Sequence, residues 1–225
     1  MFKLAKKVPT TTWSSDDPMS AKPKPKTLVI LVIGLWIFGT GDAVIIAAGL
    51  GVAPWTVLAQ GIAQTPALSI DWTIGEATFF ISVIVLFLWI PLKERPGIGT
   101  ILNAILIAAA IDIMEPKLPH PQDPLFQVIQ VLIGTILVGI GSGFYLTANL
   151  GPGPRDGWMT GIQRITKVPI GRVRTTIEII VLIIGWQLGG IFGIGTIIFA
   201  FLIGPIVALF LQLTKYLWGI DPELN

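Results

Sequence analysis

Two stretches of the chain carry the side chains best suited to hold a small charged molecule. In "FGTGDAV", Asp42 stands inside an otherwise uncharged apolar run, and in "NLGPGPRDGWMTGI" (149–162), Arg155 and Asp156 follow a glycine–proline turn. A charge within a membrane-length apolar run is costly and normally faces the interior of a helix bundle. A guanidinium beside a helix N-terminus suits a carboxylate or a phosphate. The residue types therefore indicate an anion site at Arg155 and a proton or cation site at Asp42.

Each of these charges also has a simpler interpretation. Arg155 can pair with Asp156 or extend to lipid headgroups, and Asp42 can be held by a buried hydrogen bond. Arg174 and Glu178 lie four residues apart, so they share one side of a helix and are predicted to form a structural ion pair.

Signatures of enzymatic chemistry and of metal binding are absent from the sequence. The chain has no cysteine and one histidine, His120, in the proline-rich stretch "KLPHPQDP", which gives no metal-ligand spacing. It has no HExxH motif and no phosphate-binding loop. We expect no enzyme, no cofactor and no metal. An enzyme acting on lipid would have to use Asp42 and Glu178, the best acid/base candidates within the apolar runs.

The composition is that of an all-α integral membrane protein. Of the 225 residues, 53% are hydrophobic and 12% are charged, and the mean hydropathy is +0.80. Soluble domains carry about twice this share of charged residues. The net charge of +2 is too small to indicate a nucleic-acid partner. The expected surroundings are therefore a lipid bilayer.

Six apolar segments are long enough to cross a bilayer, which takes roughly 17–25 helical residues. Each must be helical, because a lone strand in lipid would leave its backbone groups unpaired. The last two are separated by a glycine-rich turn at 189–195, where glycine makes the turn sterically easy. The predicted spans are 27–48, 74–92, 97–114, 125–148, 171–190 and 194–213.

The sequence repeats itself. With a shift of 100, positions 33–62 match 133–162 at ten of thirty places, and glycines and prolines recur in order. With a shift of 96, "GIGTILNAILI" (97–107) matches "GIGTIIFAFLI" (193–203) at eight of eleven places. The chain is therefore predicted to consist of a first repeat, 27–114, and a second repeat, 125–213, joined by a loop at 115–124.

Three spans in each repeat make the second repeat enter the membrane from the opposite side, which gives an inverted repeat. Lysine and arginine favour the cytoplasmic side. The connection 149–172 holds several basic residues, whereas its counterpart 49–73 has Asp71 as its only charge. We expect 149–172 inside, 49–73 and 115–124 outside, and both termini in the cytoplasm.

Each repeat is predicted to contain a short helix after its first span, at about 54–64 and 154–166. Proline is tolerated in the first helical turn, and these segments are too short to span. They are expected to lie at the interface or to re-enter the protein. The candidate ligand-binding residues are Asp42, Pro54, Trp55, Asn149, Pro154, Arg155 and Asp156.

The two ends of the chain are expected to be tails. Residues 1–26 are rich in lysine and proline without helical periodicity, so we predict a disordered, basic, cytoplasmic tail. Residues 214–225 are predicted to form a second cytoplasmic tail.

The segments "LGVAPWTVLAQGI", "NLGPGPRDGWMTGI" and "VPIGRVRTTIEI" resemble bacterial YczE-type membrane proteins of the YczE/YyaS/YitT group. The resemblance covers roughly residues 27–213. It implies a multi-spanning protein of the bacterial cytoplasmic membrane, and it supplies no catalytic residues and no ligand.

Two functions remain open at this point. The first is a transporter or permease-like protein for a small anionic solute, bound between the repeats by Arg155 and coupled to a proton or cation by Asp42. The second is a membrane scaffold that positions a cytoplasmic protein partner through its basic inner surface. Glycine-rich helix faces could also bring two copies together as a homodimer.

Overall fold

The computed structural model describes residues 8–65 and 71–220, and every regular element within these ranges is helical. An isolated bridge joins Thr11 to Gly219. The elements are α1 (Pro25–Ala48), α2 (Pro54–Ala63), α3 (Ile74–Phe87), α4 (Ile98–Met114), the 3₁₀ turn η2 (Glu115–Lys117), α5 (Pro124–Ala148), α6 (Pro154–Thr166), α7 (Ile170–Gln187) and α8 (Ile194–Trp218). Each predicted span and each predicted short helix corresponds to one of these helices.

Four helices are long and apolar enough to cross a membrane: α1, α4 continued through η2, α5 and α8. The helix α3 is apolar but has 14 residues, and α7 carries Arg172, Arg174 and Glu178 among its 18 residues. The predicted span 74–92 ends early because the chain turns after Phe87 and reaches Lys93 with a left-handed φ of 56°. At the other end of the chain, α8 runs five residues past the predicted 213.

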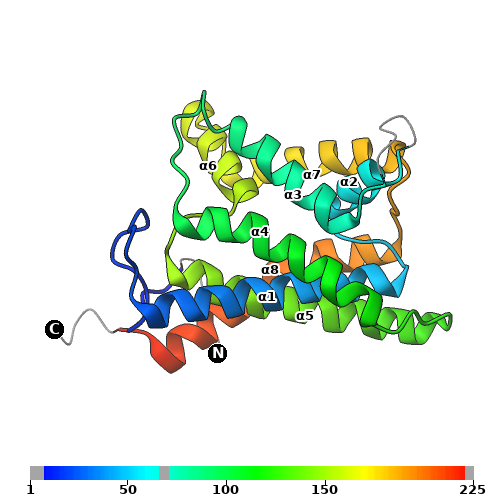
Figure 1. The fold of residues 1–225 in the computed structure, drawn as a ribbon, viewed down its shortest axis with the longest axis horizontal. Helices are drawn as coiled ribbons and strands as arrows, with labels where there is room; N and C mark the ends of the chain where they lie inside the picture. The colour runs from blue at the N-terminus through cyan, green and yellow to red at the C-terminus, as the bar shows by residue number, and fades with distance from the viewer. Residues whose placement is uncertain (1–7, 66–70, 221–225) are drawn as a thin grey trace.

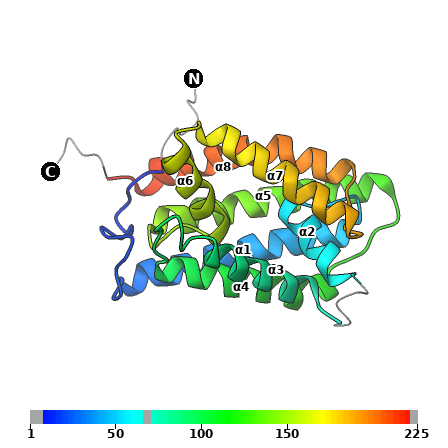
Figure 2. The same ribbon diagram turned by 90° about the horizontal axis from the view of Figure 1, so that it is seen from above.

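The helices form two layers (Figure 1). One layer contains α1, α4, α5 and α8, and the other contains α2, α3, α6 and α7. The long helices alternate in direction along the chain, so that α1, α4 and α7 run one way while α3, α5 and α8 run the other. Seen from above, the short helices α2 and α6 lie between α3 and α7, one toward each end of the molecule (Figure 2).

The first layer is built around the crossing of α1 and α5, the most extensive helix contact in the molecule. Glycines let the two backbones approach. A Cβ added at Gly41 would lie 2.7 Å from the carbonyl oxygen of Gly134, and a Cβ added at Gly134 would lie 2.7 Å from that of Gly41. Gly34 and Gly141 meet in the same reciprocal way farther along. Close approach through small residues is how membrane helices gain packing energy without a hydrophobic drive.

The second layer has its own apolar core around the short helices. Seven of the ten residues of α2 are buried, including Trp55, which is 5% exposed. Met159 of α6 and Trp89 at the end of α3 are 3% and 2% exposed and pack in the same cluster. The helix α2 therefore lies inside the protein.

Residues 8–24 do not form the disordered tail that composition predicted. Trp13 is 2% exposed, and its carbonyl accepts a 2.6 Å hydrogen bond from Thr27. Ser14 donates to the carbonyl of Thr147 at 2.7 Å, and the backbone of Ser15 donates to that of Ala148 at 3.0 Å. The segment packs because it satisfies carbonyls that the end of α5 leaves open. Lys3, Lys6, Lys7 and the tail 221–225 lie outside the described residues.

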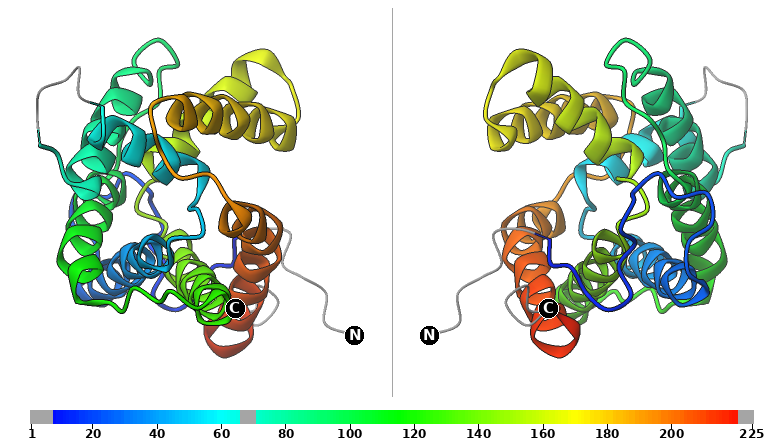
Figure 3. Two further views of the ribbon diagram at one scale, coloured as in Figure 1. Left: turned by 90° about the vertical axis from the view of Figure 1, so that its right-hand side faces the viewer. Right: turned by 90° about the vertical axis from the view of Figure 1, so that its left-hand side faces the viewer.

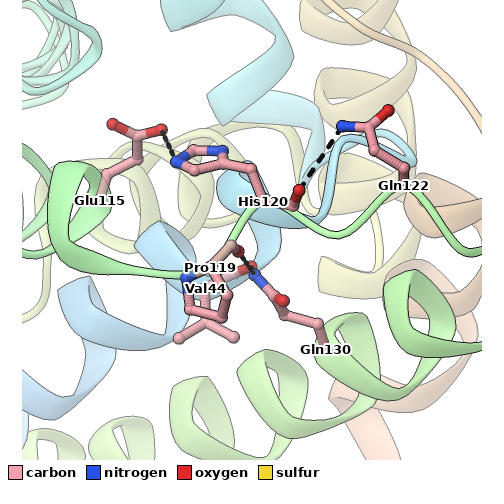
Figure 4. A network of polar contacts seen from close by, with 6 residues as sticks. All are labelled: Val44, Glu115, Pro119, His120, Gln122 and Gln130. Carbon is pink, nitrogen blue, oxygen red and sulfur yellow. Dashed lines mark hydrogen bonds and ion pairs between the residues drawn. The ribbon is translucent and has the colours of Figure 1, made fainter.

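The loop between α4 and α5 is tied to the end of α1 (Figure 4). The side-chain amide of Gln130 donates to the carbonyls of Val44, at 3.1 Å, and Pro119, at 2.9 Å. His120 lies 3.7 Å from the carboxylate of Glu115, so its neighbour within the loop is an acid rather than a metal-ligand set.

Candidate functional site

The short helices begin where the chain makes tight turns. Gly51 and Gly151 have φ angles of 99° and 103°, which favour glycine. The preceding carbonyls anchor these turns to the other half of the chain: Leu50 accepts from the backbone of Gly195 at 2.8 Å, and Leu150 accepts from that of Gly99 at 2.7 Å. Each turn therefore positions the N-terminus of a short helix against the other half of the chain.

The N-termini of α2 and α6 meet in the second layer. The guanidinium of Arg155 lies 5.1 Å from the centre of the Trp55 ring, within the range of a cation–π contact. Trp158 packs edge-to-face on Trp55, with ring centroids 6.3 Å apart. No described residue accepts a hydrogen bond from the Arg155 side chain. Its five N–H donors are therefore available to an anion.

Asp42 faces this meeting point from α1. It is 3% exposed, and it lies close enough to Arg155 for the two opposite charges to attract each other. No described residue hydrogen-bonds to its carboxylate. Because every fully buried polar side-chain atom of the described chain has a partner, the carboxylate oxygens of Asp42 must border accessible space. The buried hydrogen bond considered as an alternative for Asp42 is thus not present.

Two further pairs surround Arg155 and Asp42. Tyr145 of α5, which is 4% exposed, donates a short hydrogen bond from its hydroxyl to Asp156. On α7, Arg174 donates to Glu178 at 2.8 Å, which confirms the predicted ion pair. Asp156 is therefore held by Tyr145 rather than by Arg155, and the alternative of an Arg155–Asp156 pair fails.

The start of α6 adds backbone donors. It has no side-chain cap, and its first turn closes with the amide of Gly157 donating to Gly153 at 2.9 Å. The amides of Arg155 and Asp156 have no acceptor among the described residues. A helix N-terminus with free amides carries partial positive charge. Together with the Arg155 guanidinium, it can bind a carboxylate or a phosphate.

The structure brings most of the predicted site residues together. Pro54, Trp55, Pro154, Arg155 and Asp156 lie at the two helix starts, and Asp42 faces them.

Asn149 does not belong to the site. It ends α5 with a left-handed φ of 52°, and its side chain donates to the carbonyl of Ser15 at 2.8 Å. Tyr145 was not predicted as a site residue from the sequence. The available signal was that this position in the span holds a tyrosine, whereas its counterpart 100 residues earlier, Ile45, is apolar.

A cavity of about 520 Å³ lies elsewhere, at the N-terminal end of α3. Its walls include Trp72, Phe80 and the carboxylates of Glu76 and Asp112. These carboxylates are occupied, because Glu76 accepts from the backbone of Thr73 and Asp112 accepts from its hydroxyl. The cavity is therefore explained by how α3 begins, and it does not reach the site at Arg155.

Comparisons with known proteins agree with this membrane architecture. Residues 25–212 match the model of a family of unknown function, DUF6198. The chain is 42% identical to an uncharacterized protein of Haemophilus influenzae over 99% of its own length and 100% of that protein. It is 33% identical to the uncharacterized membrane protein YczE of Bacillus subtilis over 80% of both chains. It is also 26% identical to the uncharacterized protein YyaS of Bacillus subtilis, over 81% of this chain and 91% of YyaS. No solved structure matches.

Proposed function

Because the chain belongs to the DUF6198 family and is related to a membrane protein, we propose that it is a six-span transporter of a small anionic solute. In this proposal, the bacterial cytoplasmic membrane holds α1, α3, α4, α5, α7 and α8 as spans, with both termini in the cytoplasm. The protein carries out no catalytic step. The anion binds Arg155 and the start of α6.

The alternating helix directions support six spans. Since α3 and α7 run antiparallel to the helices that precede and follow them (Figure 1), each carries the chain back across the same thickness. The turn after α3 and the turn before α7 add to the distance that these two shorter helices cover across the membrane. Two of the charges on α7, Arg174 and Glu178, pair with each other at 2.8 Å, which lowers the cost of placing them in a span.

Paired contacts support two inverted repeats. Under the shifts of 100 and 96, the Leu50–Gly195 hydrogen bond corresponds to the Leu150–Gly99 hydrogen bond, and the two lengths agree within 0.1 Å (2.8 and 2.7 Å). The Gly41–Gly134 contact likewise maps onto the Gly141–Gly34 contact. Such reciprocity is expected of two copies related by a two-fold axis in the membrane plane.

The observation that carries the function is the pair of unpartnered opposite charges, Asp42 and Arg155, inside the membrane region. Charged groups at membrane depth that make no hydrogen bond within the protein are costly, so we expect them to be retained for a ligand that reaches them through the space they border. The anion satisfies the Arg155 guanidinium, while a proton or cation neutralises Asp42.

Purified protein in liposomes tests the proposal. A panel of labelled small carboxylates and phosphates is screened for flux, with and without a proton gradient. We expect saturable uptake of at least one solute, a loss of more than tenfold in Arg155→Ala, and loss of gradient dependence in Asp42→Asn. Arg164→Ala is the matched control, since Arg164 on the same helix forms a half-exposed 3.1 Å ion pair with Glu94. Absence of flux from the whole panel, or full activity of both variants, contradicts the proposal.

The scaffold alternative drew on the basic inner surface and on the lysine-rich tail as a docking arm. Residues 8–24 are instead packed against α5 and α1 through Ser14 and Trp13, so this part of the chain is not available as a flexible docking arm. We therefore favour the transporter.

A further inference from the structure

The two halves of the molecule differ most clearly in the contact between their last two long helices. At one end, α3 packs along α4: the hydroxyl of Thr73 donates to Asp112 at 2.6 Å, and the backbone of Gly75 donates to the same carboxylate at 2.8 Å. Their counterparts in the second half are Pro169, Gly171 and Ala208. No such contact joins α7 to α8, and these two helices stand apart (Figure 3).

Gly171 and Gly204 lie at the positions where a contact between α7 and α8 would form. A Cβ added at Gly171 in α7 or at Gly204 in α8 would meet nothing within 4 Å, unlike a Cβ at any other glycine among the described residues. The shift of 96 maps Gly75 onto Gly171 and Ala108 onto Gly204. In the first half, Gly75 packs directly against the backbone of Ala108. Glycine destabilises a helix relative to alanine, and the described packing gives neither glycine a compensating role.

The helix α7 is held at its other end. Gly185 packs against the backbone of Leu58 in α2. Beyond the helix, the backbone of Ile191 donates to the side-chain oxygen of Gln60 at 3.1 Å. The C-terminal end of α7 is therefore anchored on α2. Near the N-terminal end, Val173 is buried in the apolar cluster of the second layer, but the side of α7 at Gly171 faces open space.

We infer that the face of α8 around Gly204 is a docking surface for α7. In a second conformation, Gly171 of α7 packs against Gly204 of α8, just as Gly75 packs against Ala108 in the first half. This inference rests on the inverted repeat of the proposed function. The two halves exchange arrangements: α7 closes on α8 while α3 leaves α4. With the termini in the cytoplasm, the described conformation is open at the cytoplasmic end, and the second is open at the outer end.

The movement also reaches the site. The helix α7 carries Arg174 and Glu178, and Arg155 feels the charge of Glu178. A swing of α7 about its anchored end therefore changes the charges that face a bound anion. Access and affinity change together, as alternating access requires.

A cysteine pair tests the docking surface directly, because the chain has no cysteine of its own. A disulfide needs Cβ atoms about 4 Å apart. Thr73→Cys with Asp112→Cys is the control pair, because these side chains touch in the described conformation. Pro169→Cys with Ala208→Cys occupies the counterpart positions. We expect both pairs to cross-link within one chain in native membranes under mild oxidation.

Two outcomes of this experiment overturn the inference. One is failure of the 169/208 pair to cross-link where the 73/112 pair does. The other is a cross-link between two chains, which would show that a second copy covers this face of α8. A protein that forms the 169/208 disulfide within one chain but transports no solute contradicts the proposed function, and it supports the second conformation.

A bulky residue at Gly204 provides a second test. Because nothing lies near a Cβ there, Gly204→Leu should keep or raise the melting temperature. It should nevertheless reduce 169/208 cross-linking more than tenfold and leave 73/112 cross-linking intact. Leu213→Phe is the control, because Leu213 is exposed and lies on the opposite side of α8 from Gly204. Unchanged 169/208 cross-linking in Gly204→Leu contradicts the inference.

Discussion

Trp55 and Arg155 lie 100 positions apart, at matching places in the proposed repeats, and the Arg155 guanidinium is 5.1 Å from the centre of the Trp55 ring. In a two-fold arrangement, only residues near the axis contact their own counterparts. The meeting of these side chains therefore places the candidate site where the two halves join. The substitution of tryptophan by arginine leaves the site with one apolar and one cationic wall, so a symmetric scaffold presents an asymmetric surface to a ligand.

Tyr145 is expected to control how strongly Arg155 binds an anion. Its hydroxyl holds Asp156; without it, the carboxylate is free to compete for the guanidinium. Because a hydrogen bond to a charged group contributes about 1.5–3 kcal/mol, Tyr145→Phe should weaken anion binding about tenfold or more. Calorimetry with the transported solute measures the effect. Tyr216→Phe, at a site that is 79% exposed, should leave affinity unchanged, and equal affinities in both variants would contradict this role.

Gly157 should tolerate no added methyl group. A Cβ there would overlap the ring of Trp89, whose Nε1 donates to the carbonyl of Pro154 at 2.9 Å. Overpacking a filled core typically costs about 1–3 kcal/mol, so Gly157→Ala should lower the melting temperature in detergent. Gly171→Ala, which adds its methyl group to open space, should keep or raise it. The reverse order would contradict the packing described.

At the scale of the helices, periodicity and turn chemistry predicted most of what forms. The short helix at 154–166 begins and ends as predicted, because proline and the glycine hinge specify its start locally. The end of α3 was missed, since the turn after Phe87 depends on Trp89 docking on α6, which is a tertiary contact. Asn149 was wrongly assigned to the site because an asparagine after an apolar run looks the same whether it binds a ligand or ends a helix.

The packing of residues 8–24 also depends on tertiary contacts that the sequence does not reveal. The lysines and prolines of this segment gave no helical pattern, and its packing depends on the single side chain of Trp13 and on carbonyls at the end of α5. Composition does not reveal such partners. By contrast, Asp42 could be selected from the sequence as a charge in an apolar run, and Arg155 as a cation beside a predicted helix start.

Trp13 is expected to contribute strongly to stability. Replacing a buried tryptophan by alanine typically costs about 3–5 kcal/mol, so Trp13→Ala should unfold at a clearly lower temperature. Trp186→Ala removes a ring that is 61% exposed in the absence of lipid and should have a much smaller effect. Equal thermal shifts would mean that the segment 8–24 does not pack as described.

At the scale of the molecule, the proposed function requires two copies of one helical unit that face opposite sides of the membrane. The reciprocal glycine contacts of α1 and α5 and the converging starts of α2 and α6 follow from that arrangement. The missing contact between α7 and α8 (Figure 3) is an exception to this two-fold arrangement. That exception is the reason for inferring a second conformation.

Labelling of single cysteines distinguishes an inverted repeat from any other arrangement of the spans. Asp71 and Lys167 are counterparts under the shift of 96 and are both exposed, so neither substitution disturbs packing. In intact spheroplasts, a membrane-impermeant maleimide should label Asp71→Cys at once, and Lys167→Cys only after the membrane is permeabilised. Labelling of both positions from the same side would contradict the inverted repeat and any transport pathway built on it.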